Sequence, residues 1–164
     1  MGDWKTLRDL RNQVRPPTST QALLQKNRHG IHRQRWIDIE IETELRKYLA
    51  GTCRDIKCPS HKIGGSDDHL HIACTLARTM AISTLVEEIK TSSSKWMKTK
   101  GDQYADFAWQ NGYGAFSIGQ SQLPDLEHYI ANQREHHRRL SFQDEYRQIL
   151  AKYEIEYDER YVWD

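Results

Sequence analysis

Two histidines, His69 and His71, lie one residue apart in a segment of alternating polarity. Leu70, Ile72 and Cys74 occupy the alternate positions. Because residues two apart on a strand point to the same face, this pattern predicts a strand over 69–76 with both imidazoles on one side. Two neutral imidazoles so placed can bind one divalent metal ion. The competing interpretation is two polar side chains on the solvent face of a half-buried strand.

Tyr129 and Gln133 supply a candidate nucleophile and a candidate third metal ligand. The surrounding residues predict a helix over about 122–139, with Ser121 as a plausible N-cap. Positions four apart lie on one face of a helix, so the phenol and the carboxamide would project together. The competing interpretation is a tyrosine at the edge of the core beside a surface glutamine.

These motifs, in this order, resemble the single-tyrosine HUH transposases. Those enzymes belong to insertion sequences that move as single-stranded DNA, and some relatives are associated with repetitive palindromes. The similarity covers roughly residues 33 to 164 and includes the segments 85–90, 92–96, 107–117 and 156–164. The histidine pair alone is a weak signal, whereas all of these segments in sequence are a strong one.

The resemblance implies an enzyme that cleaves and rejoins single-stranded DNA at the hairpin-bearing ends of a mobile element. His69, His71 and Gln133 would hold Mg²⁺ or Mn²⁺, and Tyr129 would form a 5′-phosphotyrosine intermediate with the DNA. The resemblance also implies a homodimer. The alternative function is a non-catalytic or decayed derivative that binds hairpins or single-stranded DNA.

An unrelated metal-dependent phosphodiesterase is a third interpretation, and it would need a carboxylate-rich site. Asp67 and Asp68 beside the histidines offer only a weak version of one. A zinc site built from Cys53, Cys58 and His61 lacks the usual C-x-x-C spacing.

The net charge is only +1, but basic residues are concentrated in segments 1–36 and 134–139, and acidic residues in segment 141–164. Clustered lysines and arginines can neutralise phosphates, and aromatic rings can stack on unpaired bases. For each cluster, a solvated helix face is the competing interpretation. The candidate DNA-binding residues are Lys90, Lys95, Lys98, Trp109, Tyr113 and Arg134, with His136, His137, Arg138 and Arg139 beside the last of them.

The 164 residues fit one domain with a sizeable core. Hydrophobic residues make up 37% of the chain and charged residues 29%, and no run of about 18 apolar residues predicts a membrane span. No signal peptide is visible, and the three cysteines are expected to be reduced thiols. We therefore expect a cytoplasmic protein associated with the bacterial nucleoid.

The predicted elements are helices over 40–57, 81–99 and 122–139, a last helix opening at Ser141, and strands over 59–64, 69–76 and 112–118. Their order indicates an α+β, ferredoxin-like antiparallel sheet, with helices on one face and a C-terminal helix that carries the tyrosine.

The first strand of that fold is the main departure from the family pattern. Only residues 22–24 could serve as this strand, and poorly, so we expect it to be degraded or missing. The histidine strand would then have an unpaired edge, which is a hazard for folding. We accordingly divide the chain into an atypical N-terminal segment over 1–32 and a transposase domain over 33–164. The missing strand is also the feature that favours a decayed derivative.

Overall fold

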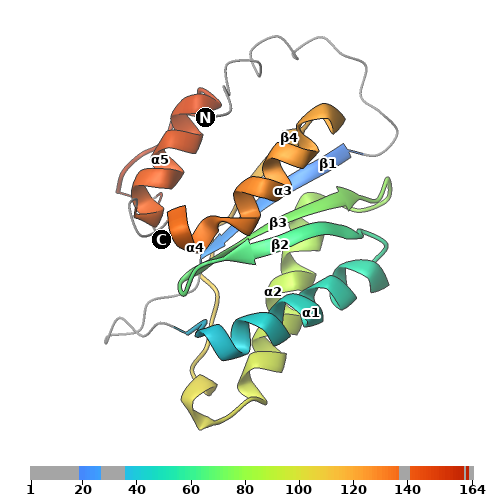
Figure 1. Ribbon diagram of the computed structural model, residues 1–164, viewed down its shortest axis with the longest axis vertical. Coiled ribbons are helices and arrows are strands. Elements are labelled where there is room, and N and C mark those ends of the chain that lie inside the picture. Colours follow the sequence, from blue (N-terminus) through green and yellow to red (C-terminus); the bar gives the residue numbers. More distant parts are fainter. Residues whose placement is uncertain (1–18, 27–35, 137–140, 161, 163–164) are drawn as a thin grey trace.

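The protein is built on one antiparallel sheet of four strands in the order β2-β3-β1-β4 (Figure 1). The computed structural model describes residues 19–26, 36–136, 141–160 and 162. The strands are β1 (Ser19–Lys26), β2 (Ser60–Gly65), β3 (His69–Leu76) and β4 (Gly114–Ile118). The chain order β-α-β-β-α-β confirms the predicted α+β, ferredoxin-like class.

Five α-helices and two short 3₁₀ helices complete the described part of the chain. They are α1 (Ile39–Asp55), α2 (Ile82–Lys98), η2 (Asp102–Tyr104), η3 (Gln120–Gln122), α3 (Leu123–Ala131), α4 (Gln133–His136) and α5 (Phe142–Lys152). Within the described residues, no helix combines the length and the apolar character that crossing a membrane requires.

The first strand is present, so the prediction that it is degraded or missing is wrong. β1 lies between β3 and β4, with Leu24 opposite His71 and Ala22 opposite Phe116. Its sequence is poor in β-branched and aromatic residues, which is why propensity did not reveal it. Backbone pairing on both sides stabilises the strand instead. The sheet therefore includes eight residues that we had placed in an atypical segment before residue 33.

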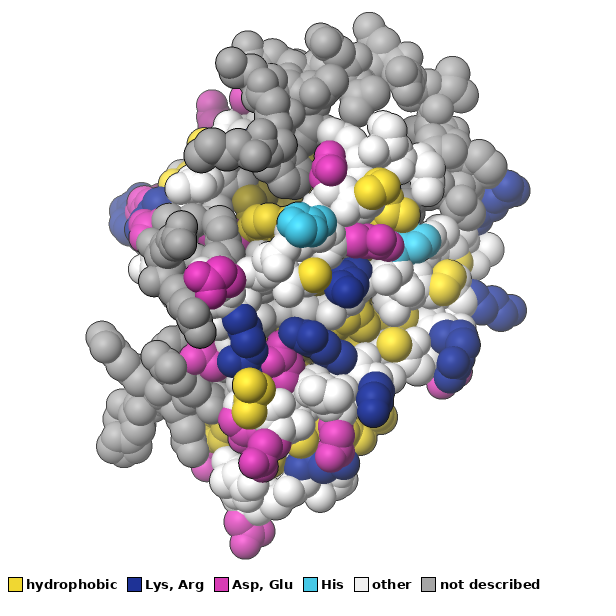
Figure 2. Space-filling view, viewed as in Figure 1, with side chains coloured by type: hydrophobic (Ala, Val, Ile, Leu, Met, Phe, Trp, Pro, Cys, Tyr) yellow, Lys and Arg dark blue, Asp and Glu magenta, His cyan; other side chains and the backbone are white. Residues whose placement is uncertain are grey.

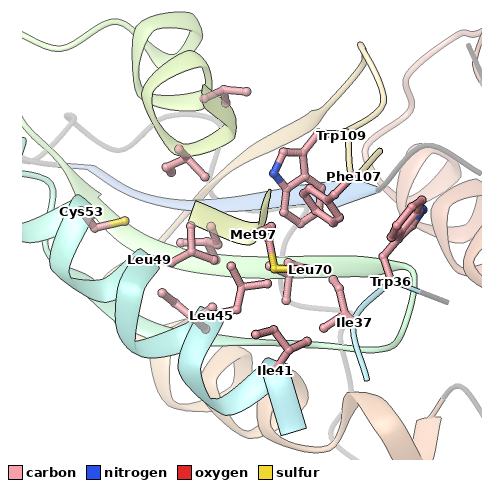
Figure 3. Packing of buried hydrophobic residues seen from close by; sticks show 14 of the residues in the cluster. Trp36, Ile37, Ile41, Leu45, Leu49, Cys53, Leu70, Met97, Phe107 and Trp109 are labelled. Atoms are coloured by element: carbon pink, nitrogen blue, oxygen red, sulfur yellow. The ribbon is translucent and has the colours of Figure 1, made fainter. Parts of the chain in front are cut away.

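Helices α1 and α2 cover one face of the sheet and enclose the larger core (Figure 1). Leu70, Ile72 and Cys74 of β3 contribute to this core, as the alternation along the strand predicted. Figure 3 shows Leu49 of α1 and Met97 near the same strand. Burial raises the pKa of the Cys74 thiol to about 12, so this cysteine is a neutral core residue.

Asp38 begins α1 as its N-cap. Its carboxylate accepts hydrogen bonds from the backbone amides of Glu40 and Ile41, at 3.0 and 2.9 Å, and from the Tyr104 hydroxyl at 2.6 Å. These bonds, the one from Ile41 foremost, hold the pKa of Asp38 below its ordinary value. The cap satisfies amides at the helix start that have no intrahelical partner.

Helix α3 lies on the opposite face of the sheet, over β2 and β3 (Figure 1). Leu123, Leu126 and Ile130 of this helix form a second, smaller core with Ala73 of β3. Ser121 does not cap the helix as predicted, because it lies inside η3 and α3 begins after Gln122. The sheet thus separates a large apolar core from the layer that contains Tyr129.

Strand β2 and helix α3 approach each other closely at Gly64. A β carbon at this position would lie 2.5 Å from the carbonyl oxygen of Ile130 and 2.8 Å from its Cγ2 atom. Both distances are far shorter than van der Waals contact. Because Gly64 has no side chain, the backbone of α3 at Ile130 can lie close to β2. Tyr129, the preceding residue, is therefore also held close to the sheet.

Gly64→Ala is therefore expected to destabilise the protein by about 1–3 kcal/mol, since the added methyl group must push α3 outward. Gly51→Ala is the matched control: it adds a β carbon within α1 that meets nothing within 4 Å. The control should change stability by less than about 1 kcal/mol and favour the helix. Urea unfolding measures both, and equal midpoints for Gly64→Ala and the unsubstituted protein would refute the close-approach argument.

Candidate functional site

His69 and His71 lie at the start of β3 on the face that α3 covers. Their ring centroids are 5.2 Å apart with the planes at 80°. His69 is 0% exposed and His71 6%, so neither imidazole is on a solvated face, and that competing interpretation is wrong. The ring of Tyr129 meets His71 edge-on at 5.7 Å. The candidate nucleophile and the histidine pair therefore come together within one chain.

Asp68 orients the ring of His69. Its Oδ1 atom lies 2.6 Å from Nδ1 of His69, so a proton on Nδ1 is donated to the carboxylate. In that tautomer Nε2 keeps its lone pair. A carboxylate behind a histidine is the usual support of a metal-binding imidazole.

Gln133 is not on the same continuous helix as Tyr129, contrary to the prediction. Helix α3 ends at Ala131, Asn132 is its C-cap, and α4 begins at Gln133. The Asn132 side-chain amide donates to the carbonyl oxygen of His128 at 2.9 Å. The break between the two helices leaves Gln133 1% exposed, at the histidine pair.

Glu145 of α5 is the site residue that the sequence did not reveal. The Tyr129 hydroxyl donates to its Oε1 atom, and the Gln133 side-chain amide donates to the same atom at 3.2 Å. The carboxylate is 2% exposed. In the sequence Glu145 is one of two acids in the first turn of a helix, a common position that carries no sign of catalysis.

The site presents several electron-pair donors to one point. The side-chain nitrogen of Gln133 donates a hydrogen bond to Glu145. The Oε1 atom of Gln133 therefore faces Nε2 of His69, 3.4 Å away. Ligand atoms of His69, His71 and Glu145 all lie within 4.8 Å of one another. Facing acceptors repel one another unless a proton or a cation lies between them. This donor set of imidazole and oxygen atoms fits a divalent metal ion.

An ion-pair cluster fixes the start of α4 beside the site. Nε of Arg134 donates to Oε2 of Glu42 at 2.7 Å, and Arg46 also pairs with Glu42. Glu42 belongs to α1 and is only 4% exposed. The ion pair between Arg134 and Glu42 joins α4 to α1 next to the edge strand β2. It thereby fixes Arg134, the residue that follows Gln133. The guanidinium of Arg134 is thus already engaged, which weakens its predicted role in binding phosphate.

Residues 29–133 match the family model described as "Transposase IS200 like". The match spans more than half of the 164 residues. The chain belongs to the IS200-like transposase family. Its members are transposases, enzymes that process DNA, so the chain belongs to a DNA-processing class.

Two solved structures share the fold of this family member. One is a protein of Deinococcus radiodurans R1 assigned as a transposase, with a TM-score of 0.53 and 17% identity over 75% of this chain and 96% of that one. The other is a REP-associated tyrosine transposase bound to a REP hairpin, with a TM-score of 0.56 and 17% identity over 77% of this chain and 72% of that one. No curated protein sequence matches this chain. At these identities the likeness shows the fold alone.

Lys90 has a structural role, which weakens its predicted role in binding DNA. Its ammonium group donates to three successive backbone carbonyls, those of Gln110 at 2.7 Å, Asn111 at 3.0 Å and Gly112 at 2.9 Å. Partial burial lowers the pKa of Lys90 from its ordinary value. The side chain holds the loop that precedes β4.

Trp109 is a core residue, which argues against its predicted stacking on bases. Its indole Nε1 donates to the Ser93 hydroxyl at 2.8 Å, and its ring packs edge-on against Phe107 at 5.1 Å. Only 7% of the residue is exposed, and Figure 3 shows it among the apolar side chains. A base cannot reach the face of this ring.

The remaining DNA-binding candidates lie apart from the histidine pair. Lys95 and Lys98 are exposed on α2, which covers the other face of the sheet, and Tyr113 is 42% exposed. His137, Arg138 and Arg139 lie outside the described residues. On the face drawn in Figure 2, basic side chains are interspersed with acidic ones. DNA contact by Lys95, Lys98 and Tyr113 stays a prediction.

Asp68→Ala should weaken Mn²⁺ binding about 10- to 100-fold, because His69 loses the partner that fixes its tautomer and ring orientation. Asp67→Ala is the matched control. It removes the same charge at the preceding residue, whose carboxylate accepts a hydrogen bond from Ser66. Isothermal titration calorimetry of the full chain measures both affinities. If the two variants bind Mn²⁺ equally well, Asp68 does not orient the ligand.

Proposed function

We propose that this chain cleaves and rejoins single-stranded DNA at hairpin-bearing ends of a mobile element, with Tyr129 as the nucleophile. The observation that carries the proposal is the meeting of Tyr129 with His69 and His71 in one buried site. The edge contact between Tyr129 and His71, at 5.7 Å between ring centroids, supports a phenol that acts beside the proposed metal ligands. One of the structural relatives is bound to a REP hairpin, which supports a hairpin as the DNA element recognised.

His69, His71 and Gln133 would hold one Mg²⁺ or Mn²⁺ ion, which when bound would neutralise charge on the non-bridging phosphate oxygens. The imidazole nitrogens and the amide oxygen are the ligand types that these ions accept. Asp68 holds His69 in the tautomer that leaves Nε2 available. Glu145 turns the Gln133 amide so that its oxygen faces His69.

Tyr129 performs the covalent step in this proposal. Its phenolic oxygen forms a bond to phosphorus while the bond to the 3′ oxygen of the preceding nucleotide breaks, so that a 5′-phosphotyrosine and a 3′-hydroxyl result. The phosphotyrosine ester conserves the energy of the phosphodiester. Attack by another 3′-hydroxyl then rejoins strands without ATP, which suits a transposase better than a nuclease.

A decayed, non-catalytic derivative is the weaker candidate. The reason for proposing it was a missing first strand, and β1 fills that place in the sheet. The homodimer that the resemblance implies stays a prediction. Tyr129 already contacts His71 of its own chain, so this proposal does not require a partner subunit to complete the site.

Tyr129→Phe should abolish covalent adduct formation with hairpin-bearing single-stranded DNA in Mn²⁺, while hairpin affinity stays within a few-fold. Only the phenolic oxygen is needed for the chemistry, and the ring still packs against His71. Tyr157→Phe is the control, because Tyr157 is 39% exposed and lies outside the site. Denaturing gels detect the adduct. An adduct that persists in Tyr129→Phe would assign the nucleophile elsewhere.

A further inference from the structure

Glu145 lies where a ligand of the metal ion would lie. Its Oε2 atom is 3.6 Å from Nε2 of His71 and 3.9 Å from Nε2 of His69. Ligand bonds of about 2.1 Å place neighbouring ligand atoms about 3 Å apart. Small movements of the side chains would therefore bring all three atoms onto one ion.

The two oxygens of this carboxylate have different surroundings. Oε1 accepts hydrogen bonds from the Tyr129 hydroxyl and the Gln133 amide, whereas Oε2 faces the two imidazoles. One side chain thus contacts the proposed nucleophile, the proposed amide ligand and the histidine pair. The donors to Oε1 are neutral groups, and a divalent ion at Oε2 would compensate the buried negative charge more completely.

Glu145 also belongs to a helix that packs on the site. Phe142, one turn earlier in α5, contacts the ring of His69 with centroids 5.0 Å apart. Tyr153, just beyond the other end of α5, packs on Phe116 of β4 at 4.6 Å. The Ser141 side chain caps the start of α5 by accepting from the Asp144 amide at 3.2 Å. A bond from Glu145 to the ion would therefore join this whole helix to β3.

We propose that Glu145 is a ligand of the divalent ion together with His69, His71 and Gln133, and that metal binding thereby holds α5 on the sheet. The inference rests on the proposed function only in taking the histidine pair as the metal site. A carboxylate reduces the net charge of the ion and its ligands from 2+ to 1+. The site then binds the ion more tightly than three neutral ligands would, and two positions of an octahedral ion stay open for substrate.

The test is titration of the DNA-free, full-length protein with Mn²⁺, followed by calorimetry and electron paramagnetic resonance. Glu145→Gln keeps the size and removes the charge, and should weaken binding at least about tenfold. Glu145→Asp keeps the charge on a shorter side chain and should bind with intermediate affinity. Asp144→Asn is the matched control: it removes an exposed charge from the adjacent position of α5 and should stay within about twofold.

Hydrogen exchange supplies a second readout. Mn²⁺ should slow exchange of the α5 amides by at least about tenfold in the unsubstituted protein and have no such effect in Glu145→Gln. Circular dichroism of the metal-free variants shows whether they fold. If Glu145→Gln does not fold, Glu145→Asp alone decides: affinity equal to that of the unsubstituted protein, with no change in exchange, overturns the proposal.

The outcomes also separate this inference from the proposed function. If Glu145→Gln binds Mn²⁺ as tightly as the unsubstituted protein while His71→Ala loses binding, the metal site stands and Glu145 is not a ligand. If neither substitution changes the affinity, the histidine pair is not the metal site, and the proposed function fails with it.

Discussion

The alternation of side chains along β3 determines what each face of the sheet does. Leu70, Ile72 and Cys74 face α1 and α2 and close the larger core, whereas His69 and His71 face the layer that contains Tyr129. A slip of one residue in strand pairing would exchange the two sets. Pairing with β1 on one side and β2 on the other holds this register. The fold and the candidate site therefore depend on the same strand.

A buried polar network connects that strand to the C-terminal helices. Asp68 hydrogen-bonds the imidazole of His69, and Glu145 hydrogen-bonds both Gln133 and Tyr129. The amide oxygen of Gln133 in turn faces Nε2 of His69. In a low-dielectric interior such a network is strongly stabilising when every member is satisfied, and costly when one is not. The close approach at Gly64 places α3 low enough on the sheet for these bonds to form. Packing and chemistry are thus set by the same few contacts.

Sequence periodicity predicted the elements whose apolar pattern is strong, such as β3 and α2, and the histidine pair on one face followed from it. It did not predict β1, since pairing with two neighbours stabilises that strand more than its own residues do. The helix break at Asn132 has neither glycine nor proline to mark it. Glu145 contacts residues far away in the sequence. Trp109 and Lys90 are engaged by residues of other segments, Ser93 and the carbonyls of 110–112 respectively, which residue type alone does not reveal. Those positions are decided by tertiary packing.

The account depends most on one claim, that His69 and His71 of β3 form one metal site beside Tyr129. The most direct measurement is a crystal structure of the Mn²⁺-soaked protein with an anomalous difference map. The account predicts one strong peak about 2.0–2.3 Å from Nε2 of both His69 and His71, next to the Tyr129 hydroxyl. Manganese bound elsewhere in the chain, with no peak at the two imidazoles, would contradict it.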